Sequence, residues 1–264
     1  MPDPALLDEL LDVALEAATK AGALLHDGRP ADLGVAATKS SPVDVVTEMD
    51  LASEKLVLEL IGTRRPQDGY LGEEGADRPG TSGVRWVVDP LDGTVNYLYG
   101  MPSWGVSVAA ELDGEAVVGV VAVPARRELF HAVLGRGAYL DGAPIRCRPA
   151  QPWGQALVST GFNYVRAVRE EQARVLLGLL PEVRDIRRGG AAAVDLCDLA
   201  AGRLDAFYER GLHAWDRAAG LLIVAEAGGV SGGRPGEPAG DALTVAAPAA
   251  TFERLTARLA ELGA

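Results

Sequence analysis

Two aspartates three positions apart are the first residues in this chain that could do chemistry. Asp89 and Asp92 stand in the stretch WVVDPLDGTVNYLYG, after a short apolar run and before a Gly-Thr pair. Two carboxylates about 4 Å apart repel by about 4 kcal/mol at an effective dielectric constant of about 20. The pair therefore needs a cation nearby, or its two side chains must be splayed into water.

Proline and glycine govern the geometry around this pair. Pro90 favours an extended backbone at the preceding residue, so we expect the strand to end at Asp89. A short helix is expected to begin near Asp92, and Gly93 allows a ligand to approach the backbone closely. Amide N–H groups at such a helix start bind phosphate oxygens, and Mg²⁺ commonly joins carboxylates to phosphate. The alternative is an ordinary Asp-Pro turn in which Asp92 caps the helix.

Three further segments carry acidic residues that also have ordinary structural explanations. YLGEEG contains Glu73 and Glu74, which as a loop pair would simply be solvated. KSSPVDVVTEMD begins at Lys39 and ends at Asp50, and HAWDRAAGLLIVAEAGG contains Asp216. Each of these two aspartates is explained most simply, when taken alone, as a helix N-cap.

Taken together, these segments resemble the inositol monophosphatase family, within the lithium-sensitive, Mg²⁺-dependent phosphatases. The matching stretches are GEEG, WVVDPLDGTVNY, WDRAAGLLIVAEAGG and KSSPVDVVTEMD. They occur in the family's order and spacing and cover most of the chain. The resemblance implies an α/β (α+β) protein, folded as a layered α-β-α-β-α sandwich. It also implies two or three Mg²⁺ ions per site and a small phosphorylated polyol as substrate.

The resemblance assigns an expected role to each matching residue. The implied metal ligands are Glu73, Asp89, the carbonyl of Leu91, Asp92 and Asp216. The implied substrate contacts are Asp92, Gly93, Thr94, Ala192 and Glu209. The implied catalytic residues are Glu73, Thr94 and Asp50, with Asp50 accepting a hydrogen bond from the Thr94 hydroxyl. Lys39, on a loop over the metals, and Glu74 are expected beside these residues.

One segment departs from the family pattern. In RRGGAAAVDLC, Ala191 stands where the family usually has Ser or Thr. The chain thus lacks one side-chain hydroxyl near the substrate. This difference affects which polyol is held more than it affects the metal chemistry.

Other nucleophiles and zinc ligands are poorly supported. Cys147 and Cys197 lie far apart in no metal-ligand spacing, and we expect them to be small buried residues or free thiols. The three histidines, His26, His131 and His213, are scattered along the chain. We therefore expect direct attack by water, with no phosphoenzyme.

Composition narrows the class of protein further. The 264 residues are 48% hydrophobic and 23% charged, which is ordinary for a globular protein, and the formal charge is −12. Such an acidic chain is not expected to bind nucleic acid. The N-terminus lacks the pattern of a signal peptide and no apolar run reaches membrane-spanning length. We expect a cytoplasmic protein without a membrane partner, and the resemblance implies a homodimer.

Periodicity predicts two halves that form one compact unit. Residues 1–150 should hold two helices, at 4–27 and 50–62, and an antiparallel meander of strands. Residues 151–264 alternate between strands and helices, which indicates α/β layers, and the resemblance implies that they complete the site. The Gly/Pro-rich stretch at 231–241 is predicted to be a surface loop.

Three functions remain open from the sequence. The leading hypothesis is hydrolysis of inositol 1-phosphate to myo-inositol and phosphate. The same chemistry could act on histidinol phosphate, fructose 1,6-bisphosphate or 3′-phosphoadenosine 5′-phosphate. The third hypothesis, a non-catalytic regulatory homologue, is weakened because the whole set of expected carboxylates is present.

Overall fold

An eight-stranded sheet dominates the N-terminal half of the protein. In the computed structural model, which describes residues 2–39 and 45–264, its strands lie in the order β10-β9-β8-β7-β6-β5-β3-β4. The strands are β3 (Gly69–Gly72), β4 (Asp77–Arg78), β5 (Val84–Asp92), β6 (Gly105–Leu112), β7 (Glu115–Val123), β8 (Glu128–Val133), β9 (Ala138–Leu140) and β10 (Ala143–Ile145). Strands β5 to β10 pair antiparallel in sequence order, which confirms the predicted meander.

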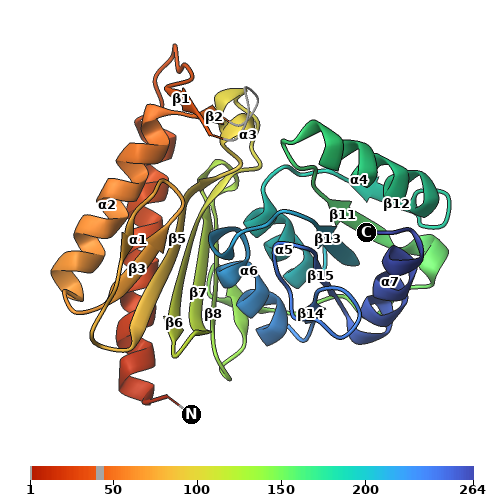
Figure 1. The fold of residues 1–264 in the computed structure, drawn as a ribbon. Coiled ribbons are helices and arrows are strands. Elements are labelled where there is room, and N and C mark those ends of the chain that lie inside the picture. Colours follow the sequence, from red (N-terminus) through yellow and green to blue (C-terminus); the bar gives the residue numbers. More distant parts are fainter. Residues whose placement is uncertain (1, 40–44) are drawn as a thin grey trace.

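Two long helices, α1 (Pro4–Asp27) and α2 (Glu48–Arg64), cover one face of this sheet (Figure 1). Asp3 is the N-cap of helix α1 and its side chain accepts a hydrogen bond from the Ala5 amide, while Pro4 lies in the first turn. Its apolar stripe is buried against the sheet, as the helical spacing predicts. A short ribbon of β1 (Ala37–Thr38) and β2 (Val45–Val46) precedes α2. Residues 40–44, the SSPVD of the predicted KSSPVDVVTEMD segment, lie outside the described residues.

A five-stranded sheet in the order β12-β11-β13-β15-β14 forms the other half (Figure 1). Its strands are β11 (Leu157–Thr160), β12 (Asp185–Arg187), β13 (Ala206–Glu209), β14 (Val230–Gly232) and β15 (Thr244–Ala247). Helices α5 (Ala192–Ala200) and α6 (Ala214–Glu226) lie between the two sheets, and α4 (Arg166–Leu179) and α7 (Ala249–Glu261) lie outside the second. The predicted α-β-α-β-α layering is confirmed.

The largest departure from the expected geometry is at Pro90. Strand β5 does not end at Asp89 but continues to Asp92, and its pairing with β6 shifts between these two residues. Proline lacks an N–H for the ladder, and the irregularity places it where no regular ladder bond is made. Helix α3 (Thr94–Leu98) then begins after Gly93, whose φ of 86° lies in the left-handed region. Asp92 is therefore not the helix cap.

The other two expected N-caps are also shifted. Asp50 and Asp216 each occupy the third position of their helices, where their carboxylates accept hydrogen bonds from the cap residues Thr47 and His213. Each forms part of a capping box, which leaves other carboxylate lone pairs open. Strand β14 takes the first residues of the stretch predicted to be a loop at 231–241. None of the helices in the described residues is long and apolar enough to span a membrane.

Candidate active site

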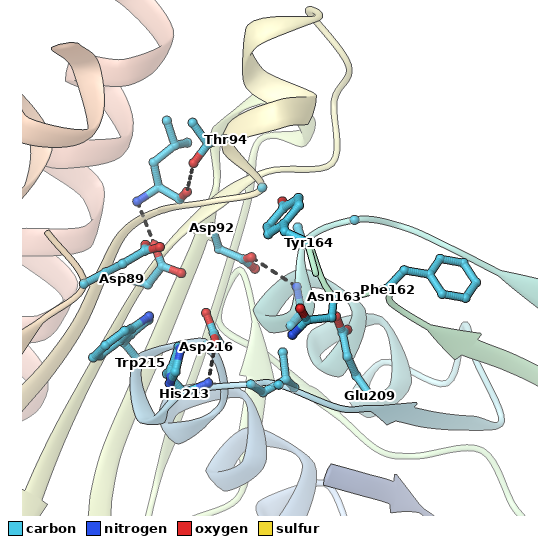
Figure 2. Close-up of a pocket in the computed structure, with 18 of the residues that line it drawn as sticks. Asp89, Asp92, Thr94, Phe162, Asn163, Tyr164, Glu209, His213, Trp215 and Asp216 are labelled. Atoms are coloured by element: carbon cyan, nitrogen blue, oxygen red, sulfur yellow. Dashed lines mark hydrogen bonds between the residues drawn. The ribbon is translucent and has the colours of Figure 1, made fainter. Parts of the chain in front are cut away.

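A cavity of about 300 Å³ opens where β5, α3, α5, α6 and β13 converge (Figure 2). Segments from both halves of the chain form its walls. The predicted site residues that line it are Lys39, Glu73, Asp89, Leu91, Asp92, Gly93, Thr94, Ala192, Glu209 and Asp216. Asp50 and Glu74, the other two, contact lining residues from behind. The fold thus gathers residues that are widely separated in the sequence.

Asp89 lies at the most buried side of the cavity. Its side chain accepts a hydrogen bond from the Leu91 amide at 2.9 Å, and the residue is 1% exposed. Burial raises the pKa of Asp89 well above its usual value, and the neighbouring charge and hydrogen bond of Glu73 raise it further. The ionised form of Asp89 would therefore be stabilised by a cation in the cavity.

Lys39 places a positive charge beside Glu73 and Glu74. Its ammonium lies 2.7 Å from Glu73 Oε1 and 2.7 Å from Glu74 Oε1. Burial works against the ammonium, yet the two carboxylates raise the pKa of Lys39 above its usual value. The lysine is therefore a protonated counter-ion at one edge of the site, as expected for a residue near Glu74.

Asp92 joins the two halves of the protein. Its Oδ1 accepts from the Ala192 amide at 3.1 Å and its Oδ2 from the Ala193 amide at 2.7 Å. Ala191 precedes helix α5 without a side-chain cap, so Asp92 caps this helix from a distant strand. Burial raises the pKa of Asp92 to about 7. Ala192, predicted to contact substrate, lines the cavity, and its amide donates to Asp92.

Asp216 projects into the same cavity from the first turn of α6 (Figure 2). Its Oδ2 accepts from the His213 amide at 2.6 Å. Burial, and then the charge of Glu73, raise the pKa of Asp216 well above its usual value. Its ionised form would be stabilised by a cation in the cavity.

A hydrogen-bonded chain connects Asp50 with Thr94. Asp50 Oδ2 accepts from the Thr47 amide at 2.8 Å and from its hydroxyl at 2.5 Å. Asp50 Oδ1 lies 2.9 Å from Thr94 Oγ1, which confirms the predicted contact. Thr94 Oγ1 is also 3.1 Å from the Leu91 carbonyl oxygen. The hydroxyl is therefore held by two acceptors at the start of α3.

Glu209 occupies the other end of the cavity (Figure 2). Its carboxylate lies directly on Gly161, because a Cβ added there would come within 1.9 Å of Oε1. Burial, and then the charge of Asp195, raise the pKa of Glu209 well above its usual value. A buried carboxyl group facing a polar cavity is suited to hydrogen bonds with ligand hydroxyls.

Several lining residues escaped the sequence analysis. Among them are Asn163, on the loop after β11, and Arg188, beside the Gly189–Gly190 turn. Asp195 lies behind that turn, where it accepts from Ser159 Oγ at 2.7 Å. The only available signal was that Arg188 lies within RRGGAAAVDLC, the segment noted for its missing hydroxyl.

The donor set fits a hard divalent cation, although the ligands are not assembled around one point. In the described parts of the chain, no three Asp, Glu, His or Cys side chains form a group that could hold a metal ion as they stand. The carboxylates instead accept hydrogen bonds from groups of the protein itself. Lys39 donates to Glu73, the first amides of α5 donate to Asp92, and the His213 amide donates to Asp216. The pKa values of Asp89, Asp92 and Asp216 are nonetheless raised, so a cation bound in the cavity would stabilise their ionised forms.

Known proteins show the family to which this chain is related. A model of the inositol monophosphatase family matches residues 6–263. Inositol-1-monophosphatase SuhB of Mycobacterium tuberculosis H37Rv is 45% identical over 236 residues, covering 85% of this chain and 81% of the relative. Nus factor SuhB of Escherichia coli K12 is 39% identical over 223 residues, covering 84% of each chain.

Solved structures are similar to this chain over nearly its whole length. The native crystal structure of extragenic suppressor protein suhB from Bartonella henselae has a TM-score of 0.87 at 36% identity, covering 94% of this chain and 97% of that chain. The structure of Mycobacterium tuberculosis SuhB has a TM-score of 0.83 at 39% identity, covering 100% of this chain and 99% of that chain. Both likenesses span the two sheets described above.

Proposed function

This chain belongs to the inositol monophosphatase family, and from that premise we propose that it hydrolyses a small phosphate monoester in a Mg²⁺-dependent reaction. We expect inositol 1-phosphate as substrate, with myo-inositol and phosphate as products. One observation carries the proposal: Glu73, Asp89, Asp92 and Asp216 face the same cavity as the start of helix α3. A phosphate would enter this acidic cavity only together with cations.

The residues proposed to hold two or three Mg²⁺ ions are all oxygen donors. They are Glu73, Asp89, the Leu91 carbonyl, Asp92 and Asp216. Mg²⁺ prefers such ligands together with substrate phosphate. When bound, it supplies Lewis-acid stabilisation of the phosphate charge and lowers the pKa of a coordinated water.

The start of helix α3 is proposed to hold the phosphate group. Gly93 and Thr94 line the cavity there, and the first amides of a helix have no acceptor within it. Thr94 Oγ1 directs its proton to Asp50 or to the Leu91 carbonyl. Its remaining lone pairs can accept a hydrogen bond from the attacking water, and Glu73 is proposed to hold that water from the other side.

Direct attack by water is supported by the state of the cysteines. Cys197 is fully buried, and burial raises the pKa of its thiol well above the usual value. Burial also raises the pKa of Cys147, to about 11. Neither thiol would be ionised near neutral pH, so neither is a suitable nucleophile.

The end of the cavity near Glu209 is proposed to hold the alcohol part of the substrate. When ionised, the Glu209 carboxylate accepts hydrogen bonds from hydroxyl groups and would repel a second phosphate. This favours inositol 1-phosphate over fructose 1,6-bisphosphate and 3′-phosphoadenosine 5′-phosphate. Histidinol phosphate, whose alcohol part is cationic, stays the main competitor among substrates with the same chemistry.

We also propose a homodimer in the cytoplasm, without nucleic-acid or membrane partners. The family resemblance supports the dimer, and the formal charge of −12 argues against a nucleic-acid surface. The proposed division of the chain at residues 1–150 and 151–264 is supported by the change of sheet between β10 and β11. Both parts contribute walls to the cavity, so we regard them as one functional unit.

The test is phosphate release from a panel of the four candidate substrates, with and without Mg²⁺, ranked by kcat/KM. We expect inositol 1-phosphate to rank first and activity to require Mg²⁺. Asp216→Asn should lower kcat at least a hundredfold, because it removes a charge proposed to bind metal, whereas the exposed Glu59→Gln should have no effect. If a folded protein releases no phosphate from any substrate with Mg²⁺, it is instead a regulatory homologue.

A further inference from the structure

Arg188 lies in the turn between β12 (Asp185–Arg187) and α5 (Ala192–Ala200). It lines the same cavity as Glu209. Its Nη1 lies against Gly190, since a Cβ added to that glycine would be 2.4 Å away. Gly190 has a φ of 89°, so the turn itself requires glycine there. The absence of a side chain at this position makes room for the guanidinium.

The charge of Arg188 is not neutralised by a direct partner in the described residues. No hydrogen bond or ion pair within 4.0 Å joins it to another side chain in residues 2–39 and 45–264. The neighbouring arginines differ: Arg187 lies 2.6 Å from Asp185, and Arg210 lies 3.2 Å from Glu171. Arg188 therefore retains donors for a ligand.

Two carboxyl groups lie near enough to feel this charge. Burial raises the pKa of both Glu209 and Asp195, and Arg188 partly offsets the rise at each. When Glu209 and Asp195 are ionised, this is a poor site for a second phosphate, because the two carboxylates would repel it. The same arrangement suits neutral hydroxyl groups, which can accept from the arginine and donate to an acid.

The rest of this wall offers few free donors. Ala191 is 2% exposed and carries no hydroxyl. The amides of Ala192 and Ala193 donate to Asp92, and Asn96 Nδ2 donates to the carbonyls of Ser103 and Gly189. Among the side chains of the segment from 188 to 193, Arg188 is thus the one that can donate to a ligand.

We propose that Arg188 determines substrate specificity by donating to a hydroxyl oxygen of the alcohol while Glu209 accepts from a neighbouring hydroxyl. The preferred ligand class is then a phosphomonoester whose alcohol carries adjacent hydroxyl groups. The proposal rests on the proposed function and deepens it. The Arg188 guanidinium would thus provide a hydrogen bond to the substrate that a Ser or Thr hydroxyl at position 191 could otherwise provide.

The test compares Arg188→Ala, Arg188→Lys and the control Arg187→Ala on two substrates, inositol 1-phosphate and phenyl phosphate, which has no free hydroxyl. Arg188→Ala should raise KM for inositol 1-phosphate about tenfold or more, with kcat within about twofold. KM for phenyl phosphate should be unchanged. Arg188→Lys should recover part of the loss, and Arg187→Ala should match the wild type.

Several results would overturn the proposal. Equal losses on both substrates would make Arg188 a phosphate-binding or structural residue. A second measurement, the binding of myo-inositol in the presence of inorganic phosphate by calorimetry, tests the role of Arg188 independently of turnover. Binding that weakens in Arg188→Ala without any turnover would refute the proposed function but support the role of Arg188. Wild-type protein that shows neither turnover nor binding would refute both.

Discussion

Replacing Lys39 with alanine should strengthen Mg²⁺ binding. The ammonium lies 2.7 Å from both Glu73 and Glu74, and 30% of the lysine side chain is exposed. Glu73 is also a proposed metal ligand, so a cation must displace the ammonium from it. Glu74, whose side chain is 5% exposed, can keep the lysine once Glu73 is released.

The size of the effect follows from the contact that is lost. Unit charges 2.7 Å apart attract by about 6 kcal/mol at an effective dielectric constant of about 20, before desolvation is subtracted. A hydrogen bond to a charged group contributes a net of about 1.5–3 kcal/mol. Removing the competition should therefore tighten the apparent Mg²⁺ dissociation constant about tenfold or more. Without metal, the variant should melt a few degrees lower, since about 1 kcal/mol shifts Tm by about 2–4 °C in a chain of this size.

The Mg²⁺ dissociation constant can be measured by calorimetric titration, and the Tm by thermal melting with and without the ion. The matched control is Lys55→Ala, which removes an exposed lysine whose nearest carboxylate, Glu59, is 3.8 Å away. The control should change neither the Mg²⁺ affinity nor the Tm noticeably. Unchanged or weaker Mg²⁺ binding in Lys39→Ala would refute the competition between ammonium and cation.

Three further predictions concern other parts of the cavity. Thr94→Val should lower kcat about a hundredfold because it removes the hydroxyl between Asp50 and the proposed water, whereas Thr94→Ser should keep most activity; equal activity of the two variants in a phosphate-release assay would contradict this role. Gly161→Ala should raise KM for inositol 1-phosphate about tenfold by displacing the Glu209 carboxylate, with kcat nearly unchanged; a wild-type KM would show that the carboxylate is not needed there. Burial raises the pKa of Asp92 to about 7 from 3.8, so its stabilising contribution is complete below about pH 3.8 and is lost as the pH rises through about 7. The Tm of metal-free protein should accordingly fall over that range and Mg²⁺ should restore it, and a metal-free Tm that rises toward pH 7 would be inconsistent with a buried, uncompensated carboxylate.

Local patterns in the sequence predicted most of the secondary structure. Helix α1 matches residues 4–27 because its apolar spacing and its caps agree with each other. The meander was predictable because turn residues separate its β-rich runs. The prediction that the strand ends at Asp89 was wrong. Pro90 restricts the backbone of the preceding residue, but this restriction does not show whether the strand continues after an irregularity.

The candidate site was predictable only where a motif existed. The motif residues Asp89, Asp92 and Asp216 line one cavity, yet nothing local indicates that Asp92 caps α5 from another sheet. Arg188 was missed because its position depends on the turn at Gly190. Such contacts arise from tertiary packing, which a single sequence does not display.

The most direct test of the account is a crystal of this protein soaked in Mn²⁺, which replaces Mg²⁺ and can be located by anomalous scattering. We predict anomalous peaks inside the cavity, with carboxylate oxygens of Glu73, Asp89, Asp92 and Asp216 about 2.1 Å away. Lys39 should have left Glu73. Strong peaks elsewhere, with this cavity empty and Lys39 still on Glu73, would contradict the claim that these carboxylates form a metal site.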